Sequence, residues 1–319
     1  MRRHLICLTI DTDADRAARA RAALEFRGLQ ALIPLRQALA ESEDRIGAGP
    51  IPVTWFVRID GEIERVLGDP LYLVHRHEDF WHQAVDHGDE IGWHPHLYHP
   101  AGSIQHPRLE TDPAWALDEL QRLYDRTRET FFDPAAFRHG EAWHNPDTFA
   151  TIEALGFRVD STAIPGRADE PLDWAGAPNQ PYFPHPRDIR RPGPDRPLLE
   201  IPMTTWSFQA SYDKAPKVRY MNPAVHPRYF DAALRWWNGR LERQPPPELS
   251  VWVLIGHPDE IHPDAPDDLL YARSPEHARR NIGRFVETLR GHADEIAFRT
   301  LSGAAAQWRE WQAGTATPG

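Results

Sequence analysis

Short apolar runs alternate with longer segments of helical period along most of the chain, and this pattern limits the fold more than any other feature. The runs predict strands at 5–10, 53–59, 90–94, 136–138, 158–161, 198–203, 250–255 and 296–300. Repeated units of strand and helix build a parallel sheet covered by helices, or a barrel. Eight predicted strands suit a barrel, so the sequence predicts an α/β fold of this kind.

Three segments between the runs carry clear signals for the start and end of a helix. The stretch "DPAWALDELQRLYDRTRETF" opens with Asp112 as the cap and a proline at the first helical position. "NPDTFATIEALGF" begins in the same way at Asn145 and ends at Gly156, where a left-handed C-cap costs least. A third helix is predicted from Ser274 to Gly291. We expect these amphipathic helices to cover the sheet.

One long segment has no sustained period. Residues 164–197 are rich in Pro, Gly, Asp and Arg, and a loop of that length inside a compact domain is usually functional. A length of 319 residues is compatible with a single barrel domain. We therefore predict one domain over residues 1–319, with a Pro-rich loop at about 164–197 that forms a lid or a pocket wall.

Composition excludes several classes of partner. The balance of 36 basic and 47 acidic residues gives a net charge of −11, which argues against nucleic acid. Long apolar stretches that could span a membrane are absent from the sequence.

The only cysteine is Cys7, which excludes an intramolecular disulfide and a thiolate zinc cluster. The N-terminal apolar run is short and acidic residues follow it, so we interpret it as a strand and expect a cytoplasmic protein.

Acidic side chains follow the first predicted strand in "LTIDTDAD". Asp11 and Asp13 do not belong to a calcium loop of the EF-hand type, because Arg16 and Ala22 stand where Gly and Glu are required. An aspartyl-phosphate phosphatase is an alternative, although the only two lysines of the chain lie in the loop-like stretch "DKAPK". Two neighbouring carboxylates at the carboxyl end of a strand repel each other and favour a bound cation.

Three histidines lie in "GWHPHLYHP", after the predicted strand at 90–94. Neutral imidazoles beside a carboxylate suit zinc and related transition metals. His94 and His96 lie on one face if the chain stays extended, whereas His94 and His99 converge if it turns. The sequence therefore suggests that these histidines and the acidic strand end form a metal site.

A series of short motifs in a fixed order carries a resemblance to a known family. The Asp-x-Asp strand and the "EIG" strand are followed by "FRHG", "TFATIEALGFRVDS", "DW", "LLEIPM" and "GHPDE". Together they resemble the polysaccharide deacetylases with a NodB-type domain, which are carbohydrate esterases of family 4. The resemblance extends from Leu5 to about Trp311. It implies a distorted (β/α) barrel and a hydrolase of amide C–N bonds that needs a divalent metal, zinc or a similar ion such as cobalt.

The resemblance also implies roles around the metal. Asp11 would act as the general base and Asp13 as a metal ligand, with His94 as a second ligand and either His96 or His99 as a third.

Four further residues receive roles from the same resemblance. Arg138 would pair with the base and orient it, and His257 would protonate the leaving amine. Asp173 would hold that histidine. Trp174, which follows it, would form a wall of the substrate pocket. Trp143 lies beside the same motifs in the sequence and is a further candidate for that wall.

The expected substrate is an N-acetylated sugar or a sugar conjugate. Two alternatives stay open: hydrolysis of a small non-sugar amide or cyclic imide, for which a metal is not essential, and a non-catalytic carbohydrate-binding protein. The sequence also leaves the oligomeric state open, including a homo-oligomer.

Overall fold

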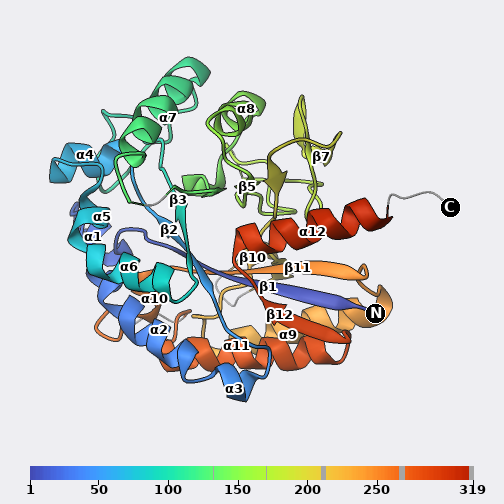
Figure 1. The fold of residues 1–319 in the computed structure, drawn as a ribbon. Coiled ribbons are helices and arrows are strands. Elements are labelled where there is room, and N and C mark those ends of the chain that lie inside the picture. Colours follow the sequence, from blue (N-terminus) through green and yellow to red (C-terminus); the bar gives the residue numbers. More distant parts are fainter. Residues whose placement is uncertain (132, 170, 210–212, 266–269, 316–319) are drawn as a thin grey trace.

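A parallel sheet of eight strands organises the fold (Figure 1). The computed structural model describes residues 1–131, 133–169, 171–209, 213–265 and 270–315. The strands of the sheet are β1 (Arg3–Asp11), β2 (Val53–Val57), β3 (Glu90–Trp93), β4 (Ala136–Phe137), β5 (Val159–Asp160), β8 (Leu199–Glu200), β11 (Leu249–Gly256) and β12 (Glu295–Phe298). Their order is β11-β1-β2-β3-β4-β5-β8, with β12 also paired with β1. Each overlaps one predicted strand, which confirms the pattern of apolar runs.

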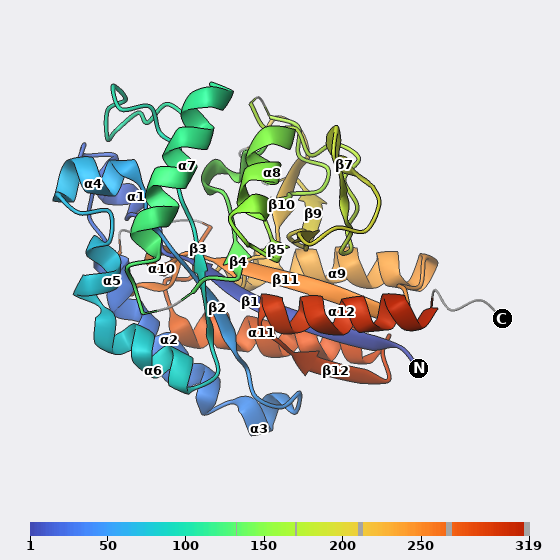
Figure 2. The same cartoon turned by 45° about the horizontal axis from the view of Figure 1, so that its top comes forward.

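Helices surround this sheet, with α7 and α8 on one side and α2, α9 and α11 on another (Figures 1 and 2). The α-helices are α1 (Arg16–Arg19), α2 (Leu32–Ala40), α3 (Glu43–Ile46), α4 (Gly61–Leu67), α5 (Tyr72–Arg76), α6 (Glu78–Asp86), α7 (Pro113–Thr127), α8 (Pro146–Ala154), α9 (Pro227–Arg243), α10 (Pro258–Ile261), α11 (Pro275–Arg290) and α12 (Leu301–Thr315). Two 3₁₀ turns are η1 (Arg27–Ala31) and η2 (Gly140–Ala142). In the described ranges, no helix combines the length and the apolar character needed to cross a membrane.

The three helices predicted from their caps are confirmed as α7, α8 and α11. The Asp112 side chain accepts the backbone N–H of Trp115 at the start of α7. Asn145 accepts the N–H of Thr148 in a capping box that starts α8, and Ser274 caps α11. These side chains satisfy backbone donors that the first turn of a helix leaves free.

Side chains alternate between the two faces of the central strand β1. Leu5 and Cys7 belong to an inner apolar cluster with residues of α12 such as Trp308. Thr9 and Asp11 continue the same inner face toward the carboxyl end of the strand. Helix α12 therefore closes one end of the barrel, and the Asp11 carboxylate lies at the opposite end.

The barrel is irregular where the two end strands of the sheet order, β8 and β11, approach each other. Strands β8 and β11 do not pair directly in the described sheet. Instead, the Thr204 N–H donates to the Val253 carbonyl at 3.2 Å, and the Ile255 N–H donates to the Met221 carbonyl at 3.0 Å. Isolated hydrogen bonds thus complete a distorted barrel.

Two small antiparallel sheets lie outside the barrel. One consists of β6 (Pro184–His185) and β7 (Asp188–Pro192), so the segment predicted as a loop at 164–197 includes regular structure. The other pairs β9 (Thr205–Phe208) with β10 (Lys217–Tyr220). The sequence did not predict either hairpin, because β7 and β10 are rich in charged residues and partly exposed, so they leave no apolar run.

Candidate active site

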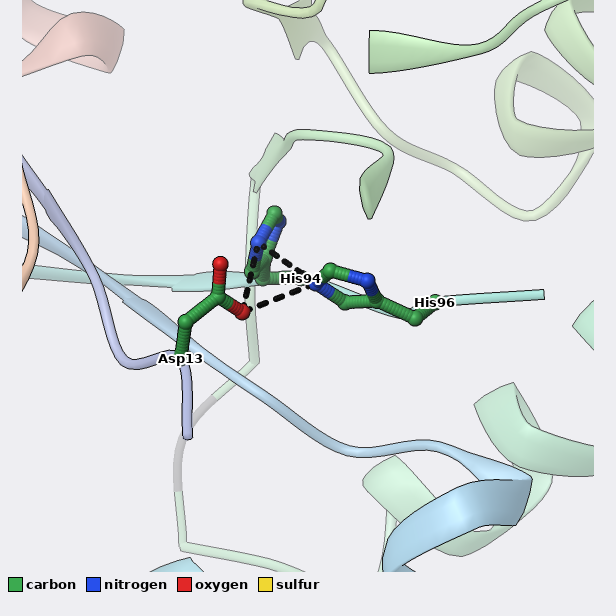
Figure 3. A group of neighbouring side chains, drawn as sticks. All are labelled: Asp13, His94 and His96. Atoms are coloured by element: carbon green, nitrogen blue, oxygen red, sulfur yellow. Dashed lines mark hydrogen bonds and ion pairs between the residues drawn. The ribbon is translucent and has the colours of Figure 1, made fainter. Parts of the chain in front are cut away.

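Asp13, His94 and His96 point toward one another at the carboxyl ends of β1 and β3 (Figure 3). One ligand atom from each lies within 4.8 Å of the others. His96 Nε2 is 2.8 Å from Asp13 Oδ1, and His94 Nε2 is 3.5 Å from the same oxygen. The two Nε2 atoms are 3.2 Å apart. Because both histidines lie on one face, the chain stays extended through Pro95, which is the first of the two paths considered from the sequence.

Hydrogen bonds to Nδ1 determine which nitrogen of each histidine carries a proton. His94 Nδ1 lies 2.8 Å from the Arg138 carbonyl, which can only accept, so Nδ1 donates and Nε2 presents a lone pair. His96 Nδ1 lies 2.8 Å from the Tyr98 hydroxyl, and that hydroxyl donates its proton to Glu141. His96 Nδ1 therefore also donates, and its Nε2 is an acceptor.

When both imidazoles are neutral, three acceptor atoms thus converge with no proton among them. Burial would raise the pKa of Asp13, but protonated, hydrogen-bonding His96 and His94 hold that pKa well below its usual range, so without a cation the imidazoles take up protons at Nε2 in its place. An ionised carboxylate and two neutral imidazoles repel one another unless a cation lies between them. This donor set fits a divalent transition metal such as zinc.

His99 lies apart from this group. Its Nε2 is 3.4 Å from Glu110 Oε2, and its side chain is 30% exposed. The chain turns beyond Tyr98, which forms an isolated bridge with Leu109. Of the two histidines considered as a further ligand, the structure brings only His96 to Asp13.

Asp11 is held by a buried arginine. Arg138 Nη1 donates to Asp11 Oδ1 at 2.7 Å, and both side chains are almost fully buried. The guanidinium also donates to Thr9 Oγ1 at 2.9 Å and to the Ser161 carbonyl at 2.7 Å, which fixes its plane. Asp11 Oδ2 lies 3.8 Å from His94 Nε2. One carboxylate oxygen is therefore bound by the arginine while the other faces His94.

His257 follows β11 and faces the same group from the other side. Its Nε2 is 3.7 Å from Asp13 Oδ2, and its Nδ1 is 3.1 Å from Glu260 Oε1. Burial lowers the pKa of His257, but the Glu260 carboxylate outweighs burial and raises it to about 9. Glu260 is itself held by Asn222 at 2.7 Å and by Arg16 at 2.5 Å. The imidazole thus carries a proton at neutral pH.

Asp173 does not hold His257, contrary to the expectation from the sequence. Its carboxylate is 53% exposed and pairs with Arg190. The neighbouring Trp174 is buried and donates Nε1–H to the Ala142 carbonyl at 2.7 Å. Since adjacent side chains point in different directions here, burial of the indole leaves the carboxylate in solvent. Glu260 occupies the position predicted for Asp173.

Side chains of this candidate site line one cavity of about 150 Å³, which we call the catalytic cavity. It is lined by Asp11, Asp13, His94, His96, His139, Glu141, Ala142, Ile164, Arg167, Leu172, Met203, Tyr220, Ile255 and His257. Part of the segment 164–197 forms one wall, as expected. Trp143 and Trp174 do not line the cavity. They are buried behind it, where Trp143 packs edge-on against His139 at 5.5 Å.

Sequence reasoning missed three residues that support the site. Glu260 stands three residues after His257, a spacing typical of a capping box, and this pattern was the available signal. Tyr98 lies in the same histidine-rich stretch, but the sequence does not show that its hydroxyl bonds to His96 and Glu141. Glu141 gave no signal, because it reaches Tyr98 through a left-handed backbone conformation with φ 55°.

No protein family model matches the chain, and no curated protein sequence matches it. Solved structures do resemble it. A protein from Mycobacterium smegmatis described as a candidate polysaccharide deacetylase has a TM-score of 0.53 and 17% identity, covering 97% of this chain and 91% of its own. A candidate glycoside hydrolase/deacetylase from Parabacteroides distasonis has a TM-score of 0.60 and 14% identity, covering 97% of this chain and 71% of its own. The chain therefore has the distorted (β/α) barrel fold of the polysaccharide deacetylase type, as the sequence motifs predict.

Proposed function

We propose that this chain is a metal-dependent hydrolase of an amide C–N bond, acting as a deacetylase on an N-acetylated sugar or a related sugar conjugate. One observation carries the proposal. A single cavity is lined by a group that can bind a cation, by a carboxylate bound to a buried arginine, and by a histidine that an ionised carboxylate partner keeps protonated. The names of the two solved structures with this fold, which refer to deacetylases, support the reaction class.

The residues divide the reaction among them. A divalent metal held by Asp13, His94 and His96 would supply Lewis acidity toward the amide carbonyl. Asp11, oriented by Arg138, accepts a proton from the attacking water.

The other side of the cavity supplies the second proton transfer. His257 donates the Nε2 proton to the leaving nitrogen as the C–N bond breaks, and Glu260 keeps the imidazole oriented and charged. One water is consumed, and the products are a carboxylic acid and a free amine.

Zinc is the ion that we propose, because two imidazoles and one carboxylate form a borderline ligand set that also suits cobalt. We retain the proposal of a cytoplasmic enzyme. The small catalytic cavity supports an acetyl group as the acyl part of the substrate.

Replacing the proposed base tests the reaction. In Asp11→Asn, acetate release from N-acetylglucosamine and other acetylated amines should fall by about 10²- to 10⁴-fold, because the amide cannot accept the proton of water. Metal content should stay unchanged. Asp147→Asn, the same change at an exposed position of α8, serves as the control. Unchanged turnover in Asp11→Asn would contradict the mechanism, and activity that survives complete metal removal would favour the metal-independent alternative.

A further inference from the structure

A second cavity of about 260 Å³ adjoins the catalytic cavity. The two share Arg167 and Tyr220 as lining residues. The β9–β10 hairpin and helix α9 form most of the second cavity, and neither was connected with function by the sequence motifs. Its aromatic lining residues are Trp206, Phe208, Tyr220, Tyr229, Phe230 and Tyr271.

The aromatic rings of this second cavity hold one another in place. Trp206 and Phe208 stack with their centroids 5.0 Å apart and their planes at 28°. Phe208 meets Tyr229 edge-on at 6.0 Å. Trp206 and Phe230 are both buried. Walls of packed aromatic rings offer flat apolar surface to a ligand, as most small-molecule pockets do.

The charged residues of the second cavity are paired. Arg167 Nε lies 2.9 Å from Asp169 Oδ2, and Arg219 binds Asp213. Lys217 Nζ lies 3.8 Å from the same Asp213. Each arginine that lines the cavity thus has an aspartate partner among the described residues, and the Lys217 side chain is 65% exposed, which favours an uncharged occupant over an anionic one.

We propose that the second cavity is a specificity subsite for a neutral, aromatic or branched apolar group of the amide substrate. The proposal deepens the function proposed above and rests on it. A volume of about 260 Å³ exceeds the roughly 150 Å³ of an apolar cavity that holds benzene, so a substituted ring fits. Tyr220 lines both cavities, and its ring lies 6.2 Å from that of His257. A ring in the subsite is therefore adjacent to the reacting bond.

Three small amides test this subsite. N-benzylacetamide carries the ring on the amine side, N-methyl-2-phenylacetamide carries it on the acyl side, and N-methylacetamide carries none. Calorimetric titration of the Asp11→Asn variant measures binding without turnover. At least one ring-bearing amide should bind about 10-fold more tightly than the ring-free amide, since burial of a ring is worth more than 1.4 kcal/mol. The tighter of the two identifies the side of the substrate that enters the subsite.

A filling substitution shows where the ring binds. Val218 lines the second cavity and is half-buried on β10, so Val218→Trp should fill the space and remove the preference for the ring. The zinc affinity of this variant should match that of the wild type, because Val218 does not line the catalytic cavity. Val85→Trp, the same change at an exposed position of α6, should affect neither property. If Val218→Trp unfolds, Tyr229→Ala should weaken binding of the ring-bearing amides by removing a wall.

The outcomes separate the two proposals. Equal binding of ring-bearing and ring-free amides, or a ring preference that survives in folded Val218→Trp and Tyr229→Ala, overturns the subsite. Ring-dependent binding without hydrolysis of any amide by the metal-loaded enzyme would support the subsite and contradict the proposed function. Hydrolysis of an amide without a ring preference would support the proposed function and contradict the subsite.

Discussion

Hydrogen bonds from Nδ1 of His94 and of His96 orient both side chains so that Nε2 of each can bind a cation. The Arg138 carbonyl fixes one proton and the Tyr98–Glu141 pair fixes the other, so both Nε2 lone pairs face Asp13. Such outer partners orient metal ligands and raise their basicity. Arg138 contributes twice, since its backbone carbonyl orients His94 while its guanidinium holds the proposed base.

Glu260 should support catalysis through His257. In Glu260→Gln the imidazolium loses its carboxylate partner, so kcat should fall by about 10- to 100-fold, less than the 10²–10⁴ that a whole general acid contributes, with little change in KM. The pKa of His257 should also fall, which moves the high-pH limb of the rate profile to lower pH. Asp173→Asn should leave both unchanged, because that carboxylate pairs with Arg190 in solvent. Equal effects of the two variants would contradict the assignment.

At the scale of elements, the short turn η2 positions the His96 ring. Gly140 lies so close that a Cβ there would be 2.4 Å from His96 Cγ, well inside van der Waals contact. The turn and the histidine-rich stretch are joined by the hydrogen bond from the Gly140 N–H to the Pro95 carbonyl at 2.8 Å. The absence of a side chain at this position therefore allows the ring to reach Asp13.

Gly140→Ala should displace His96 and weaken metal binding by about 10- to 100-fold, the usual effect of disturbing the support of a ligand. Competition titration with a zinc-sensitive dye measures the change. Gly239→Ala on α9 is the matched control, because a Cβ there would lie 3.4 Å from its nearest neighbour, the Nη1 atom at the flexible end of Arg243. Unchanged zinc affinity in Gly140→Ala would show that the turn does not position the ring.

The elements differ in how well the sequence predicts them. The strands of the main sheet were found because both of their faces are buried, which leaves a continuous apolar run such as residues 5–10. Helices α7, α8 and α11 were found from their caps. The β6–β7 and β9–β10 hairpins were missed, although the second forms part of the proposed subsite. Their strands β7 and β10 are partly exposed and rich in charged residues, so they leave no continuous apolar run in the sequence.

At the scale of the whole molecule, the fold brings distant strand ends into one cavity. The sequence predicted that Asp11, Asp13 and His94 would meet, because the carboxyl ends of parallel strands share an edge. It did not determine the choice between His96 and His99, which depends on the path of the chain. The family resemblance assigned the partner of His257 to Asp173, whereas the capping-box spacing of Glu260 was the local signal for the carboxylate that is buried beside it.

Stability should depend on pH through His4, which is buried on the central strand and packs edge-on against Trp252. Burial lowers its pKa from 6.5 to about 4. The neutral imidazole therefore contributes stability that is complete above about pH 6.5 and is lost as pH falls toward 4, because the unfolded chain binds the proton first. The loss amounts to about 3 kcal/mol at most.

Urea unfolding of the wild type and His4→Phe between pH 7.5 and 4.5 measures this contribution. Phenylalanine keeps the aromatic packing and cannot titrate, so the difference in the free energy of unfolding between the two proteins should change across this range. If the free energy of unfolding changed with pH by the same amount in both proteins, the contribution of His4 would be contradicted.

Metal binding tests the central claim most directly. Metal-free protein should bind one zinc or cobalt ion per chain, and amide hydrolysis should rise in proportion to the bound ion. His96→Gln should lose both binding and activity, whereas His99→Gln should keep both, since His99 pairs with Glu110 away from the site. A wild-type chain that binds no ion with its folded structure intact, or equal metal binding by His96→Gln and the wild type, would contradict a metal-dependent hydrolase centred on Asp13, His94 and His96.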